Sequence, residues 1–98
     1  MNQEIAKIFK EISILLSMQG VAFKPQAFER AATNIENLGE DLKDIYKKGG
    51  TKALEQIQGV GKSMAEMIEE YLKTKKIKEH LALKKKIAIL KNVKAEQI

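Results

Sequence analysis

Apolar residues recur at intervals of three and four along most of the chain, which is the period of an amphipathic α-helix. The first run predicts a helix over residues 2–19, with Asn2 as its N-cap and Gly20 as its end. Its apolar face consists of Ile5, Ile8, Phe9, Ile12, Leu15 and Leu16. A second helix is predicted up to Gly39, with Pro25 at its start, because the amide hydrogen that proline lacks would have no intrahelical partner there.

Glycines separate the helices that follow. A third helix is predicted from Glu40 to Lys48, and a short one over residues 52–57 with Thr51 as its cap. The helical pattern resumes after residue 61 and continues to about residue 74. The apolar positions of a last helix are Ile77, Leu81, Ile87, Leu90 and Val93. Since no stretch of strand length alternates with a period of two, the predicted fold class is all-α, a small domain of four to five helices.

Composition limits the function classes. A chain of 98 residues has room for one modest core. No run reaches the roughly 18 apolar residues of a bilayer span, and acidic residues near the initiating methionine exclude a secretion signal, so a natural N-terminus and no membrane partner are expected. The absence of cysteine excludes disulfide and thiol chemistry. It favours a reducing, cytoplasmic location, at the nucleoid in a bacterium or in the nucleus of a eukaryote.

The net charge of +5 is distributed unevenly. Residues 1–44 carry five basic and seven acidic side chains, whereas residues 45–98 carry thirteen basic and six acidic ones. This asymmetry fits either a surface that faces a polyanion or solvated lysine faces, and charge alone does not decide between them. All basic residues except Arg30 are lysines, which favours contacts to phosphates over the reading of bases.

The segment Gly59-Val60-Gly61-Lys62-Ser63 between two predicted helices is the strongest candidate for chemistry. Glycines allow positive backbone dihedrals and leave room for a phosphate at the amides that begin the next helix, and Lys62 would add a cation there. A nucleotide-binding P-loop is excluded because no glycine stands at position 56 and no strand precedes the turn. A tight helix-helix turn without a ligand remains the alternative.

Residues 57–68 resemble the helix-hairpin-helix motif, which binds the DNA backbone without sequence specificity. Together with Ala27-Phe28-Glu29-Arg30-Ala31-Ala32, they make the chain similar to the N-terminal helix-hairpin-helix domain of family X DNA polymerases, the polymerase beta type. The similarity predicts a domain over residues 1–85 and a C-terminal helical extension or linker over residues 86–98. It implies a monomeric module that binds gapped, nicked or single-stranded DNA in DNA repair, as part of such a polymerase or related to one.

The resemblance also implies site residues. Lys24 matches a lysine that contacts the 5′-phosphate in a pocket, Phe28 an aromatic of that pocket, and Phe23 a side chain that stacks on template bases. The complete implied DNA-binding set is Phe23, Lys24, Phe28, Gly59, Val60, Gly61, Lys62 and Ser63. A monovalent cation, sodium or potassium, would be held by the backbone carbonyls of Glu55, Ile57 and Val60.

The chain departs from this family at the position of the lysine that removes a 5′-deoxyribose phosphate, where it has Met67. Ser63 and Glu79 replace two further lysines of the pocket. We therefore expect no catalytic residue, and the chain lacks the Asp-x-Asp carboxylates of DNA synthesis. Two alternatives stay open: a lyase that uses Lys62 or Lys24 as its amine, and a helical module that docks an acidic protein through its last helix.

Two minor features are interpreted as surface chemistry. The single histidine, His80, has no carboxylate at metal-ligand spacing apart from its neighbour Glu79, so it is predicted to be a surface or interfacial residue. Glu69 and Glu70 are adjacent rather than three or four residues apart, and they are predicted only to increase solubility.

Overall fold

The computed structural model describes the backbone of residues 1–96 and the side chains of residues 1–88. This part of the chain contains five helices and no strand, so the all-α prediction is confirmed. The helices are α1 (Asn2–Met18), α2 (Lys24–Glu36), α3 (Leu42–Leu54), α4 (Lys62–Thr74) and α5 (Lys78–Glu96). None of them is long and apolar enough to cross a bilayer. The predicted apolar positions Leu90 and Val93 lie outside the described side chains.

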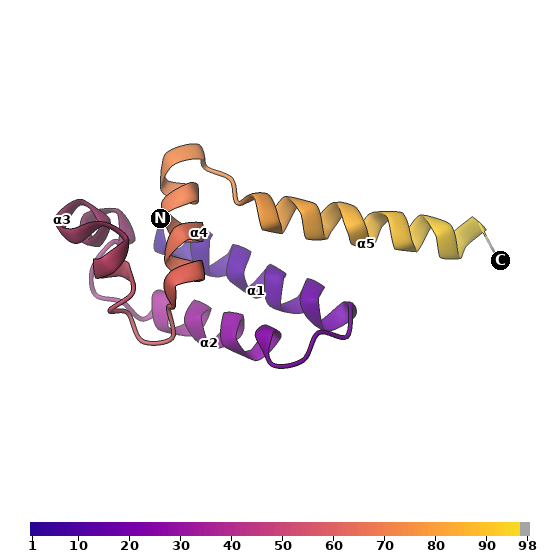
Figure 1. Ribbon diagram of the computed structural model, residues 1–98, viewed down its shortest axis with the longest axis horizontal. Coiled ribbons are helices and arrows are strands. Elements are labelled where there is room, and N and C mark those ends of the chain that lie inside the picture. The colour runs from indigo at the N-terminus through magenta and orange to yellow at the C-terminus, as the bar shows by residue number, and fades with distance from the viewer. Residues whose placement is uncertain (97–98) are drawn as a thin grey trace.

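The helices α1 and α2 form an antiparallel pair, and α4 crosses this pair (Figure 1). Phe9 of α1 and Phe28 of α2 pack edge to face, with ring centroids 5.4 Å apart. The small residues Ala31 and Ala65 are fully buried, which allows the backbones of α2 and α4 to approach the rest of the core closely. The core therefore forms around α1. The packing of α2 and α4 in this core positions the turn between α3 and α4.

The sequence predicted Asn2 as the N-cap of α1, but the N-cap is Met1. The side-chain amide of Asn2 instead bonds to the start of α3, where Nδ2 donates to the carbonyl of Glu40 at 2.9 Å and Oδ1 accepts from the amide of Leu42 at 2.7 Å. Asp41 is the N-cap of α3 and accepts from the amide of Lys43 at 2.8 Å. Asn2 thus holds the start of α3, and α3 begins two residues later than predicted.

For two helices, the predicted C-terminal end lies further along the chain than the observed one. The second helix ends at Glu36 rather than near Gly39. The prediction of a separate short helix after the two glycines is correct in substance, because α3 consists of two helical segments that meet at Gly50, where φ is 65° and ψ is −153°. This second segment ends at Leu54, three residues before the predicted end at Ile57.

The helix α5 runs alongside α1 in the same direction and continues past its end (Figure 1). Ile77 and Leu83 are buried at this contact, and His80 Nε2 lies 2.6 Å from Glu11 Oε2. His80 was predicted to be a surface or interfacial residue; it is not on the surface, since only 7% of it is exposed, and it lies where α5 meets α1 with a partner distant in sequence. The predicted boundary at residue 85 falls inside α5, and the division there stays a prediction.

A hydrogen bond between α4 and α1 makes the stability of the fold dependent on pH. The hydroxyl of Tyr71 donates to Glu4 Oε2 at 2.5 Å, which lowers the pKa of Glu4 and raises the pKa of Tyr71. A lowered carboxyl pKa contributes stability above its unfolded value, and that contribution is lost as the pH falls through the folded value. The raised pKa of Tyr71 contributes stability below its ordinary value, and that contribution is lost at alkaline pH.

We therefore expect the wild type to lose more stability than Tyr71→Phe when the pH is lowered from about 5 to about 3, across the ordinary range of a glutamate pKa. Urea unfolding at several pH values measures this difference. Parallel stability curves for the two proteins would show that the hydrogen bond does not couple folding to the protonation of Glu4.

Candidate nucleic-acid interface

The connection between α3 and α4 is a compact hairpin closed by backbone hydrogen bonds. The amide of Ile57 donates to the carbonyl of Leu54 at 3.1 Å, and the amide of Val60 donates to the carbonyl of Ile57 at 3.0 Å. Gly59 has a φ of 85°, the left-handed conformation that favours glycine. Val60 is buried in the hydrophobic core, whereas the flanking Gly59 and Gly61 are exposed.

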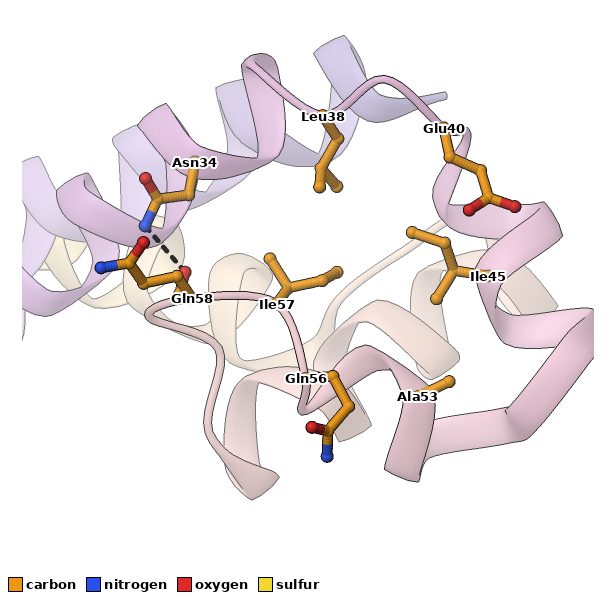
Figure 2. Close-up of a pocket in the computed structure, with 8 residues that line it drawn as sticks. All are labelled: Asn34, Leu38, Glu40, Ile45, Ala53, Gln56, Ile57 and Gln58. Carbon is orange, nitrogen blue, oxygen red and sulfur yellow. Dashed lines mark hydrogen bonds between the residues drawn. The ribbon is translucent and has the colours of Figure 1, made fainter.

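The hairpin is also fastened to α2. Asn34 Nδ2 donates to the carbonyl of Gln58 at 2.7 Å, and Figure 2 shows this bond beside an open groove of about 440 Å³ behind the hairpin. A side chain at Gly59 would place its Cβ 3.1 Å from Asn34 Nδ2 and 3.6 Å from the Cα of Ala31. Sequence reasoning missed Asn34, because its partner, the carbonyl of Gln58, lies 24 residues away along the chain.

The hairpin leads directly into the first turn of α4. Gly61 is the N-cap, with a φ of −87° and a ψ of −175°, and it makes no side-chain cap hydrogen bond. Nothing lies within 4 Å of the position that a Cβ would take on Gly61, and Lys62 and Ser63 are exposed. The first amide hydrogens of a helix have no intrahelical partner. The leading amides of α4 therefore border open space next to Lys62. This arrangement suits a phosphate, which accepts hydrogen bonds from such amides.

Phe23 occupies a strained and exposed position just before α2. Its φ of 68° and ψ of −41° are close to a classic γ-turn, and the amide of Lys24 donates to the carbonyl of Ala22 at 2.8 Å across it. The side chain is 85% exposed. A left-handed conformation at a non-glycine residue costs about 1–3 kcal/mol, and such strain concentrates at functional sites. The ring is thus held out in solvent next to Lys24.

One pocket gathers most of the residues singled out for 5′-end recognition. Its volume is about 170 Å³, and it lies where the first turns of α2, α4 and α5 meet. The lining residues are Lys24, Ala27, Phe28, Ser63, Met64, Met67 and Glu79. Phe28 and Met67 are buried at its base, whereas Lys24 and Glu79 are exposed. The pocket therefore combines an apolar base with one amine and one carboxylate, and a thioether stands where a lyase would need its lysine.

The carbonyls of Glu55, Ile57 and Val60 all belong to the hairpin. Ile57 and Val60 are brought together by the hydrogen bond between them, and a carbonyl oxygen that accepts one hydrogen bond keeps a second lone pair. The predicted monovalent cation would be held by these three oxygens and would carry positive charge toward a DNA phosphate. Binding of the ion stays a prediction.

A family profile described as a helix-hairpin-helix domain matches residues 1–77. The chain belongs to the helix-hairpin-helix domain family. Such domains generally bind DNA without sequence specificity. No curated protein sequence matches this helix-hairpin-helix domain significantly. The match contains the hairpin, the pocket helices α2 and α4, and the α1 helix on which they pack, but it ends just before α5 begins.

Two lysines of α4 in this helix-hairpin-helix domain lie far apart, and one of them is distant from the hairpin. Lys62 lies at the start of α4, whereas Lys73 lies near its end, about 17 Å away at 1.5 Å per residue.

The adjacent glutamates of α4 both have partners in neighbouring helices. Glu69 lies 3.8 Å from Lys73 and also accepts a hydrogen bond from the hydroxyl of Tyr46 at 2.6 Å. Glu70 accepts from the amide of Lys78 at 2.9 Å. The prediction that both glutamates are merely solubilising was wrong, since each holds a neighbouring helix.

Proposed function

We propose that this helix-hairpin-helix domain binds gapped, nicked or single-stranded DNA through its backbone, with little dependence on base sequence. The observation that supports this most strongly is the open first turn of α4, where Gly61 leaves the leading amides uncovered and Lys62 lies beside them. A strand phosphate would accept hydrogen bonds from these amides, and Lys62 would neutralise part of its charge. A monovalent cation at the hairpin carbonyls would contribute to the same contact.

The position of the pocket supports a proposal for how the bound DNA strand is oriented. Lys24 belongs to the pocket, and its neighbour Phe23 projects into solvent, where an unpaired base could stack on the ring. We infer that the strand on the hairpin ends at the pocket with its 5′ terminus and that Phe23 meets the opposite, template strand. This arrangement suits a monomeric DNA-repair module, either within a family X DNA polymerase or related to one.

Salt dependence tests the proposed function. About four phosphate contacts on single-stranded DNA give a slope near −3 in a plot of log affinity against log salt concentration. We expect this slope in fluorescence anisotropy titrations with single-stranded and gapped oligonucleotides of unrelated sequence, with affinities that agree among the sequences. A slope near zero, or strong dependence on sequence, would contradict backbone binding.

A further inference from the structure

The pocket at the start of α2, α4 and α5 contains opposite charges that face the same small space. Lys24 lies at the start of α2 and Glu79 in the first turn of α5, and both line the pocket. Among the described residues, neither of them takes part in a side-chain ion pair. Both charges are therefore available to a ligand, and their sum at neutral pH is close to zero.

We propose that Glu79 makes this pocket select DNA ends with a 5′-hydroxyl over those with a 5′-phosphate. A phosphate monoester carries a charge of about −1.5 to −2 at neutral pH, so its attraction to Lys24 is offset by repulsion from Glu79. Helix starts attract anions, but Glu79 already supplies an anion in the first turn of α5. A terminal hydroxyl is neutral, and it can donate a hydrogen bond to the Glu79 carboxylate.

The remaining lining suits the same ligand. Phe28, Met64 and Met67 offer apolar surface to a deoxyribose ring, and the Ser63 hydroxyl can both donate and accept a hydrogen bond. Phosphate sites usually surround their ligand with several cationic or amide donors. The leading amides of α4 are assigned above to a phosphate within the strand, so the described side chains of the pocket leave one amine, that of Lys24, for the strand end. The inference rests on the proposed function, because it names the strand end that the same DNA-binding surface accepts.

The test compares two gapped duplexes that differ only in whether the downstream strand begins with a 5′-hydroxyl or a 5′-phosphate. We expect the wild type to bind the hydroxyl end more tightly than the phosphate end in fluorescence anisotropy. Glu79→Gln should shift the ratio of the two dissociation constants toward the phosphate by about fivefold, the upper effect of one exposed charge pair, and Glu79→Lys by more.

Glu66→Gln is the matched control, because it removes the same charge from an exposed position on α4 that does not line the pocket. It should change both affinities equally and leave their ratio unaltered. The ratio is insensitive to a partial loss of folding, since both duplexes meet the same protein. A wild type that binds the phosphate end as tightly as the hydroxyl end, or more tightly, overturns the proposal, and so does a ratio that Glu79→Gln leaves unchanged. Failure to bind either duplex would instead refute the proposed function.

Discussion

Replacing Gly61 by aspartate is expected to abolish DNA binding while leaving the fold intact or slightly more stable. Aspartate is a favourable N-cap and would accept a hydrogen bond from the first amides of α4, the same groups that the proposed phosphate contact requires. Loss of two hydrogen bonds to a charged phosphate lowers affinity by about 100-fold or more. The cap and the helix dipole should raise the free energy of unfolding by up to about 1 kcal/mol. Anisotropy titration and urea unfolding measure the two effects.

Two controls separate the causes of this loss. Gly61→Asn offers the same cap without the charge, so a similar loss would show that the amides themselves are needed. Gly39→Asp introduces the same charge at an exposed glycine that likewise has nothing within 4 Å of its Cβ position, and it should weaken binding little. Undiminished affinity in Gly61→Asp would rule out the start of α4 as the phosphate site.

Replacing Gly59 by valine is expected to destabilise the protein severely, by about 2–3 kcal/mol, through its backbone and its surroundings. A β-branched residue is strained at a φ of 85°, and the added side chain would push against Asn34 and break its hydrogen bond to the Gln58 carbonyl. For a domain of this size, such a loss lowers Tm by about 10–20 °C. Thermal unfolding followed by circular dichroism measures it.

Gly61→Val is the matched control for this prediction. It introduces the same side chain two residues away, at a φ of −87° and in open space, so its effect on stability should stay within about 1 kcal/mol, the usual cost of a poor N-cap. An equal loss of stability in both variants would show that the left-handed conformation of Gly59 and its contact with α2 are not what the hairpin requires.

Much of the candidate site could be predicted because its residues lie within one short segment or one known pattern. Gly59 and Gly61 flank the buried Val60 at the spacing that predicted a helix-helix turn, and the structure has that turn. The resemblance also selected Lys24 and Phe28 of α2 and Ser63 of α4, and all three line one pocket. The DNA contacts assigned to these residues remain predictions.

Other features could not be predicted, because each depends on a partner far away in the sequence. Asn2 has a good cap side chain, yet it bonds to the Glu40 carbonyl and the Leu42 amide at the start of α3, about 40 residues along the chain. His80 has no acidic partner within its own segment, but the packing of α5 along α1 brings it to Glu11. Local periodicity carries no information on which helix faces meet.

By itself, the sequence determined the helical elements and their breaks, since amphipathic spacing and glycines act over a few residues. It also determined the local form of the hairpin, which depends on the positive φ of Gly59 and on the buried Val60 beside it. Only the tertiary structure decided that Phe23 is held in a strained γ-turn and that Lys24 and Glu79 face one pocket. The physical reason is that the charges lining a pocket depend on which helices pack together. Lys24 and Glu79 are 55 positions apart in the chain, and the packing of α2, α4 and α5 brings their charges to the same pocket.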